Sequence, residues 1–199
     1  MIVGHHMTHN PVVIGPDEFL AAADERMRQR SFRRLPVVCG GKLVGMLTER
    51  DLRQHLGYLG NTKVNAAMTE SVITLSPNDT IEKAAHLMLE RKIGGLPVVE
   101  ASELVGIITY SDILETFLKV IGASEEGTAR IDLLVGPGAN LSTASKTVED
   151  EGAEIVGLGT YRETWGKDSV CYMRLRCTDP QHIAAVLQTK GYSVVGVYS

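Results

Sequence analysis

The heptapeptide GMLTERD occupies residues 45–51, and a close copy, GIITYSD, occupies residues 106–112. The same shift of 61 residues places MT at residues 7–8 on MT at 68–69, and LPVV at 35–38 on LPVV at 96–99. Agreement in several separate motifs indicates an internal duplication. Because the chain holds two copies, we expect a paired module with approximate two-fold symmetry rather than an open solenoid.

Hydrophobic periodicity predicts the elements inside each copy. Ile81, Ala84, Ala85 and Met88 recur at the spacing of an amphipathic helix. The stretches LPVV and KLVGMLT around Gly40-Gly41 are short, apolar and β-branched, which favours two strands joined by a tight turn. Each copy should therefore run strand, helix, strand, strand, helix.

The last 70 or so residues show a different order. RIDLLV predicts a strand, LSTASKTVEDEG a helix, EIVGLGTY and SVCYMRLRC two strands, and a further helix and strand follow. This βαββαβ order is ferredoxin-like. We therefore predict a mixed α/β (α+β) chain with repeat 1 at residues 1–60, repeat 2 at 61–121, a linker at 122–128 and a C-terminal domain at 129–199.

Composition narrows the class of protein. The chain has 199 residues, 44% of them apolar, and a net charge of -4, which argues against a partner such as a nucleic-acid backbone. No apolar run approaches membrane-spanning length and no leader precedes the first repeat, so we expect a cytoplasmic protein without a membrane partner. Residues 1–60 carry 8 Arg/Lys against 6 Asp/Glu, whereas residues 61–122 carry 5 against 8, so a small anion should prefer the first third.

The threonine and aspartate of the repeated heptapeptide have two interpretations. The pattern [ST]-x-x-[DE] before an apolar run is the capping-box signature, in which Thr48 and Thr109 would only start helices. Alternatively, hydroxyl and carboxylate project from one face at a helix N-terminus, where free N–H groups favour phosphate. The carboxylate would then hold a group with paired donors, such as a ribose diol. Both interpretations remain open at this stage.

The repeated LPVV, GhhTxxD (h is apolar) and MT motifs resemble a tandem pair of CBS domains, the Bateman module, over residues 1 to about 121. The resemblance implies binding of an adenosyl compound, AMP, ADP, ATP or S-adenosylmethionine, and no catalytic residues. The positions it implies for ligand contact in the second copy are Thr62, Asn65, Ala67, Ile93, Ile107, Thr109 and Asp112. In the first copy they are Gly4, His6, Phe32, Met46, Thr48 and Asp51.

The two copies differ where phosphate charge matters. Arg33-Arg34 precedes LPVV in the first copy, whereas Gly94-Gly95 stands there in the second, and Arg50 becomes Ser111. We therefore hypothesise unequal sites, with phosphate recognised mainly through Arg33 or Arg34 and the second copy supplying a pocket for base and ribose.

The C-terminal domain is similar to an ACT domain through Gly136-Pro137-Gly138 and the later EGAEIVGL. Val135-Gly136 stands where ACT domains that bind amino acids carry an acidic residue, so pairing with a second ACT domain is the expected role. A CBS pair followed by an ACT domain resembles the AcuB-type proteins of acetoin utilisation, which implies regulation of an enzyme that remains unknown.

We therefore expect a non-enzymatic regulator, a homodimer through its CBS and ACT portions, that changes arrangement when an adenine nucleotide binds. The alternatives are a ligand-free dimerisation module that regulates a partner enzyme, and amino-acid sensing by the ACT-like domain. Neither part shows paired acids, a nucleophile elbow or a metal cluster. His5, His6 and His9 have no counterparts in the second copy, and the three cysteines lack zinc-site spacing, so no metal or required cofactor is expected.

Overall fold

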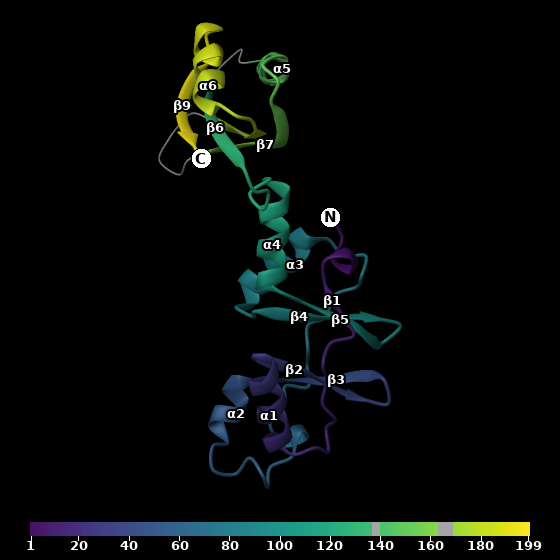
Figure 1. Cartoon of the computed structure of the whole chain (residues 1–199). Helices are drawn as coiled ribbons and strands as arrows, with labels where there is room; N and C mark the ends of the chain where they lie inside the picture. Colours follow the sequence, from purple (N-terminus) through teal and green to yellow (C-terminus); the bar gives the residue numbers. More distant parts are fainter. Residues whose placement is uncertain (137–139, 163–168) are drawn as a thin grey trace. The chain divides into compact units, whose positions relative to one another are not determined.

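The computed structural model describes residues 1–136, 140–162 and 169–199 (Figure 1). The chain divides into two compact units, Met1–Ile113 and Leu114–Ser199. The first unit contains the first repeat and the second repeat as far as Ile113. The Pro137-Gly138 part of the ACT-like turn lies outside the described residues.

The first repeat follows the order that the periodicity predicts, the second does so only from its first helix onward, and a short 3-10 turn precedes each. The elements of the first repeat are η1 (Val3–His5), β1 (Thr8–His9), α1 (Leu20–Arg30), β2 (Arg34–Cys39), β3 (Lys42–Thr48) and α2 (Glu49–Gln54). Those of the second are η2 (Val64–Ala66), α3 (Ile81–Arg91), β4 (Gly95–Glu100), β5 (Glu103–Thr109) and α4 (Tyr110–Val120). Residues Thr69 and Met46 form only an isolated bridge, so the leading strand of the second repeat is not developed.

The two hairpins have the same register. The strand pair β2–β3 shifts register between Val37 and Val38, and β4–β5 shifts between Val98 and Val99, which are the residues 61 positions later. Helices α1 and α3 also end alike, since Ser31 and Lys92 both adopt the left-handed conformation after the last turn. The duplication seen in the sequence is therefore a duplication of backbone geometry.

The leading segments of the two repeats are exchanged. The N–H of Val3 donates to the carbonyl of Asp79 at 2.7 Å, and the N–H of Val64 donates to the carbonyl of Glu18 at 2.9 Å. Val3 is buried in the core of the second repeat, whereas Val64 is buried in the core of the first. A division of the chain at residue 60 therefore cuts through both cores.

Glycine in the repeated heptapeptide makes this exchange possible. A Cβ atom added at Gly45 would lie 2.5 Å from the Sδ atom of Met68 and 3.1 Å from the carbonyl oxygen of Thr69. Met7 occupies the equivalent position over Gly106. The methionine of each MT motif thus packs on the glycine of the other repeat, where a larger residue would leave no room.

Within the described part of the second unit, four strands form an antiparallel sheet in the order β7-β8-β6-β9. The elements are β6 (Thr128–Val135), α5 (Leu141–Asp150), β7 (Glu154–Arg162), β8 (Ser169–Arg176), α6 (Pro180–Thr189) and β9 (Ser193–Tyr198). This is the βαββαβ order that the sequence predicts. One face of the sheet packs on α5 and α6 through an apolar core that includes Ile131, Val148, Met173 and Leu187.

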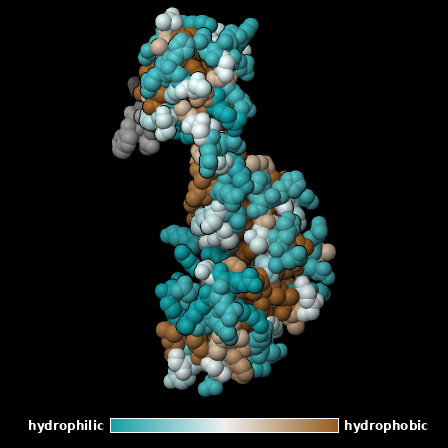
Figure 2. All heavy atoms as spheres, in the orientation of Figure 1, coloured by the Kyte–Doolittle hydropathy of each residue, from teal (hydrophilic) through white to brown (hydrophobic). Residues whose placement is uncertain are grey.

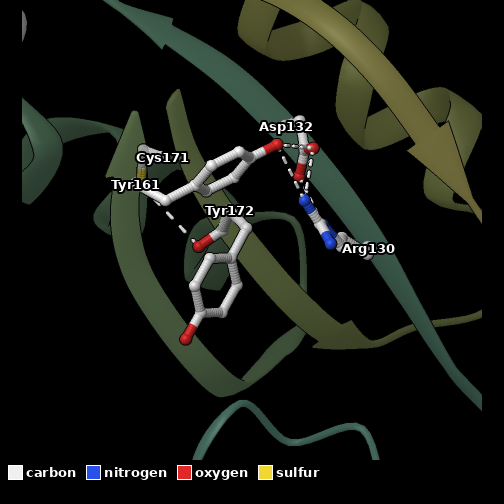
Figure 3. A network of polar contacts seen from close by, with 5 residues as sticks. All are labelled: Arg130, Asp132, Tyr161, Cys171 and Tyr172. Carbon is white, nitrogen blue, oxygen red and sulfur yellow. Dashed lines mark hydrogen bonds and ion pairs between the residues drawn. The ribbon is translucent and has the colours of Figure 1, made fainter. Parts of the chain in front are cut away.

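The opposite face of this sheet carries a polar network (Figure 3). Arg130 donates from Nε and Nη2 to the two carboxylate oxygens of Asp132, both at 2.6 Å, and Asp132 is 4% exposed. The Tyr161 hydroxyl donates to Asp132 at 3.2 Å, and the Arg130 guanidinium lies about 5.5 Å from the ring centres of Tyr161 and Tyr172. The buried carboxylate is therefore paired and hydrogen-bonded, which offsets its desolvation.

The segment 121–127, which connects α4 to β6, is an ordered turn. The N–H of Ala123 donates to the carbonyl of Leu118 at 2.8 Å, and Arg176 pairs with Glu125 at 2.8 Å. A Cβ atom at Gly157 would lie 2.6 Å from the carbonyl oxygen of Ile121. The turn therefore packs closely on β7 rather than forming an extended tether.

Helix α4 carries apolar side chains at the surface in its last two turns, as the brown spheres over this helix in Figure 2 show. Leu114 is 59% exposed and Phe117 is 55% exposed.

In the described residues, no helix has the length and apolar character needed to cross a membrane. The same residues contain no group of three or more His, Cys, Asp and Glu side chains placed to hold a metal ion.

Candidate functional site

A cavity of about 800 Å³ lies within the first unit. This volume is in the range of small-molecule sites. Its walls come from both repeats and from the segment after β1. The lining residues are Thr8, Asn10, Pro11, Val12, Arg30, Ser31, Phe32, Arg33, Arg34, Pro36, Gly94, Ile107, Thr109, Tyr110 and Ser111.

The cavity joins the end of α1 in the first repeat to the start of α4 in the second. Helix α1 ends at Arg30, and the left-handed Ser31 turns the chain so that Arg33 and Arg34 lead into β2. On the other side, β5 ends at Thr109 and Tyr110 begins α4. The cavity therefore belongs to the repeat pair, because neither repeat alone supplies both walls.

The charge of the lining is one-sided. Three arginines, Arg30, Arg33 and Arg34, contribute to the walls, and the residues that line the cavity include no Asp or Glu. Burial lowers the pKa of Arg34 from its ordinary value, and the adjacent positive charge of Arg33 lowers it further. The Arg34 guanidinium is still charged at neutral pH. An anion bound beside it would compensate for the hydration that the guanidinium loses on burial.

Arg34 reaches across to the second repeat. Its Nη1 atom donates to the carbonyl oxygen of Gly95 at 3.3 Å. A Cβ atom at Gly94 would lie 2.6 Å from Nη2 of Arg34, and one at Gly95 would lie 2.8 Å from Nη1. The glycines that replace the Arg33-Arg34 pair in the second repeat thus provide the space in which this guanidinium lies.

Both threonine–aspartate pairs form capping interactions. Oγ1 of Thr48 donates to Oδ2 of Asp51 at 2.6 Å, the Thr48 N–H donates to the same oxygen at 2.8 Å, and the Asp51 N–H donates to Oγ1 at 3.4 Å. Oγ1 and N–H of Thr109 each donate to Oδ2 of Asp112 at 2.7 Å. The capping box is therefore complete in the first repeat, and in the second repeat the Asp112 carboxylate accepts from the Thr109 N–H in the same way. Thr109 in addition lines the cavity.

The structure brings together five of the residues expected to contact a ligand. These are Phe32, Arg33 and Arg34 from the first repeat and Ile107 and Thr109 from the second. The lining does not include the others, namely Gly4, His6, Met46, Thr48, Arg50, Asp51, Thr62, Asn65, Ala67, Ile93 and Asp112. The two sets that the resemblance implies, one for each repeat, are thus mixed in this cavity.

Several of those other residues have structural contacts. The carbonyl of Thr62 accepts from the Leu20 N–H at 2.9 Å, and the Asn65 N–H donates to the carbonyl of Pro16 at 2.9 Å. Ala67 packs on the core of the first repeat. Ile93 packs on the core of the second repeat, so both residues stabilise the fold where they lie.

The motifs did not single out some of the cavity residues. Thr8 lies in β1, and Asn10, Pro11 and Val12 follow it. All four belong to the exchanged leading segment, so their position depends on a tertiary contact. Tyr110 and Ser111 follow Thr109 directly, and their equivalents in the first repeat are Glu49 and Arg50. These two differences between the repeats are the sequence signal that could have identified Tyr110 and Ser111 as site residues.

The exchanged segments, the duplicated hairpins and the cavity between repeats define a paired α/β module. The CBS domain family matches residues 3–58 and 64–119, more than half of the chain. The chain belongs to the CBS domain family. The match ends at residue 119, before β6, so the assignment of the βαββαβ part to the ACT family stays a prediction.

Known proteins share this module. Protein MJ1225 of Methanocaldococcus jannaschii is 33% identical over 131 residues, which are 58% of this chain and 47% of that protein, and its structure gives a TM-score of 0.56. An acetoin utilisation protein (AcuB) from Vibrio cholerae is 30% identical, with a TM-score of 0.57 over 63% of this chain and 96% of that chain.

Two solved structures that resemble the chain contain adenosyl ligands. The CBS domain pair of protein MJ0100, in complex with 5'-methylthioadenosine and S-adenosyl-L-methionine, is 28% identical over 59% of this chain and 99% of that chain, with a TM-score of 0.55. CBSX2, in complex with AMP, is 29% identical over 60% of this chain and 97% of that chain, with a TM-score of 0.54. The chain spans about half the length of MJ1225.

Proposed function

We propose that this protein is a non-enzymatic regulator that binds an adenosyl ligand carrying phosphate, such as AMP, ADP or ATP, in the cavity between the repeats. The observation that carries the proposal is the lining itself, which combines three arginines with no carboxylate. An anion entering this space meets positive charge in a partly desolvated setting, where charge-assisted hydrogen bonds are strong. S-adenosylmethionine, which has no phosphate, fits this lining less well.

The lining offers a distinct group for each part of such a ligand. Arg33 and Arg34 would bind the phosphate, and Thr109, whose hydroxyl donates to Asp112, lines the same cavity at the start of α4. Asp112 lies outside the lining but accepts a hydrogen bond from the lining residue Thr109, and its carboxylate is the proposed acceptor for ribose hydroxyls. The aromatic rings of Phe32 and Tyr110 and the side chain of Ile107 provide apolar surface for the base.

The neighbouring proteins support this ligand class. MJ0100 binds 5'-methylthioadenosine and S-adenosyl-L-methionine, and CBSX2 binds AMP. For the present chain, the arginines at residues 33 and 34 favour the phosphate-bearing members of this class.

Equilibrium binding of AMP, ADP, ATP and S-adenosylmethionine tests the proposal, with light scattering on the same samples to follow size. We expect at least one of the three nucleotides to bind, and S-adenosylmethionine to bind more weakly. Arg34→Ala should weaken nucleotide binding, because its guanidinium is the more enclosed of the two. The absence of binding by any adenosyl compound would contradict the proposal.

A second function, that of a ligand-free assembly module, is favoured by the complete capping box at Thr48 and by the hydrogen bonds between Thr109 and Asp112. In that case Asp112→Ala would lower stability alone, whereas loss of a ribose contact would also lower affinity. Comparing the free energy of unfolding with the dissociation constant for each variant separates the two functions.

The regulatory role requires a structural response to the ligand. We propose a homodimer, for which the exposed apolar side chains of α4, including Leu114 and Phe117, provide surface that water solvates poorly. The regulated enzyme is unknown. Scattering with and without nucleotide measures both the size of the assembly and any change in its shape.

A further inference from the structure

The arginines that line the cavity between the repeats have no anionic partners in the part of the chain that the structure describes. Within that part, neither Arg30 nor Arg33 makes an ion pair or a side-chain hydrogen bond. Arg34 has one hydrogen bond there, from Nη1 to the carbonyl oxygen of Gly95, although a guanidinium has five N–H donors. The other donors of these side chains are therefore available to an anion that enters the cavity.

The lining offers no carboxylate to a divalent cation that accompanies such an anion. Mg²⁺ bound to a nucleotide in a protein is usually held by one or two carboxylates in addition to phosphate oxygens and water. No residue of the lining is Asp or Glu. The side-chain oxygens of Thr8, Asn10 and Ser111 are neutral, so they supply no charge to offset the guanidiniums. The positive charge of the site therefore comes from the protein and leaves no favourable place for a metal ion.

Asp112 is the one carboxylate that adjoins a lining residue in the sequence, since it follows Ser111. Its Oδ2 atom accepts from the N–H and from Oγ1 of Thr109, both at 2.7 Å. In the complex proposed above, its carboxylate also accepts from ribose hydroxyls. We therefore assign Asp112 to the sugar and not to a metal ion on the phosphates.

We propose, building on the nucleotide-binding function proposed above, that the cavity binds adenine nucleotides in their metal-free form, so that Mg²⁺ competes with the arginines for the phosphates of ADP and ATP. A bound Mg²⁺ neutralises phosphate charge that the guanidiniums would otherwise pair with, and it adds a cation that they repel in a partly desolvated site. AMP, with a single phosphate group, binds Mg²⁺ weakly. In the presence of Mg²⁺ the site therefore favours AMP over ATP.

Calorimetry on the full chain tests the inference. AMP, ADP and ATP are each titrated once with EDTA and once with Mg²⁺ in excess over the nucleotide, and KCl keeps the ionic strength equal because salt screens charges. We expect Mg²⁺ to weaken ATP binding by about 10-fold to 100-fold, the range for one hydrogen bond to a charged group. ADP binding should weaken in the same direction, and AMP binding should stay nearly unchanged.

A charge placed in the lining provides a second measurement. Ser111→Asp puts a carboxylate in the first turn of α4, where the helix dipole favours negative charge, so the variant should fold. It should weaken the binding of metal-free ATP, and it should bring the ratio of ATP affinities without and with Mg²⁺ closer to one, because the carboxylate can coordinate the cation. Ser111→Asn has a similar shape without the charge and should keep the wild-type ratio.

The outcomes separate this inference from the proposed function. Equal or tighter ATP binding with Mg²⁺ would overturn the inference while leaving nucleotide binding intact. An equal loss of AMP and ATP affinity on addition of Mg²⁺ would also overturn it, because the effect would not depend on the metal–nucleotide complex. So would binding of AMP with no binding of ADP or ATP in EDTA. If no nucleotide binds in either buffer, the proposed function itself fails and this inference fails with it.

Discussion

Nη1 of Arg34 donates a hydrogen bond to the carbonyl oxygen of Gly95, the residue that occupies the equivalent position in the second repeat. Duplication alone would put two arginines at this point. Their repulsion is avoided because the second repeat carries glycines, and the space that these leave accommodates one guanidinium. A symmetric fold thereby acquires an asymmetric charge distribution.

Gly95→Ala should destabilise the repeat pair by about 1–3 kcal/mol, the usual cost of adding a methyl group to a packed core. The new Cβ atom would lie 2.8 Å from Arg34 Nη1, 3.2 Å from the Ile108 carbonyl oxygen and 3.3 Å from Thr109 Cγ2. Urea denaturation measures the change. Gly60→Ala, where nothing lies within 4 Å of the added atom, is the control and should cost little. Equal effects in both variants would argue against close packing at Gly95.

Thr48→Ala and Thr109→Ala should each lower the free energy of unfolding by about 1 kcal/mol, because both hydroxyls take part in capping interactions. Only Thr109 lines the cavity. We therefore expect Thr109→Ala to weaken AMP binding and Thr48→Ala to leave it near the wild-type value. Denaturation and calorimetry on both variants distinguish the loss of stability from the loss of affinity. Equal losses of AMP affinity in the two variants would contradict the assignment of the ligand to the cavity that Thr109 lines.

Val3→Ala should destabilise the second repeat, although Val3 precedes the first. Val3 and Val64 are both fully buried, each in the core of the other repeat. Truncation of either should cost about 2 kcal/mol through lost burial and the cavity left behind. Hydrogen exchange locates the damage. Amide protection should fall at Val98 with Val3→Ala and at Val37 with Val64→Ala, whereas the reverse pattern would contradict the exchange of segments.

Asp132→Asn should cost about 3 kcal/mol, because it leaves the Arg130 guanidinium against an uncharged amide in a largely buried place. Tyr161→Phe removes a hydrogen bond to the same carboxylate and should cost about 1 kcal/mol. Thermal unfolding monitored by circular dichroism measures both. A smaller loss for Asp132→Asn than for Tyr161→Phe would show that the ion pair does not stabilise the sheet.

The pH dependence of stability should include two equivalent carboxylates. Hydrogen bonds from Arg26 and Lys83 lower the pKa of Glu18 and Asp79 in the folded protein from their ordinary values of 4.5 and 3.8. A lowered folded pKa means that the unfolded chain binds more protons, so this stability is present above those values and is lost as pH falls through the folded pKa values. The double variant Glu18→Gln and Asp79→Asn should therefore lose less stability between pH 5 and pH 2 (an approximate window) than wild type. A parallel pair of pH curves would contradict this.

Much of the fold could be predicted from the sequence because it repeats. The 61-residue shift, the helical spacing of Ile81, Ala84 and Met88, and the apolar runs around Gly40-Gly41 all predicted elements that the structure contains. These signals are local, since side chains one turn or two residues apart share a face whatever lies opposite. The βαββαβ order of the C-terminal unit followed from the same periodicities.

The candidate site was predicted less completely. Ligand positions were assigned within each repeat, whereas the cavity combines Arg33 and Arg34 of one repeat with Ile107 and Thr109 of the other. Thr8 and Asn10 were missed, because they reach the cavity only through the pairing of β1 with β5 of the second repeat. Sequence spacing contains no information on which repeat a short leading segment packs against.

The sequence by itself determined the duplication, the helix starts at Thr48 and Thr109, and the replacement of Arg33-Arg34 by Gly94-Gly95, since each is a matter of local pattern or identity. The tertiary structure decided which residues of the two repeats line the same cavity. Burial of Val3 and Val64 in exchanged cores places the leading segments across the pair, and the pairing of β1 with β5 brings Thr8 and Asn10 to the cavity that Thr109 lines. Long-range packing sets that arrangement, because apolar burial depends on the surface a segment meets and not on its neighbours in the chain.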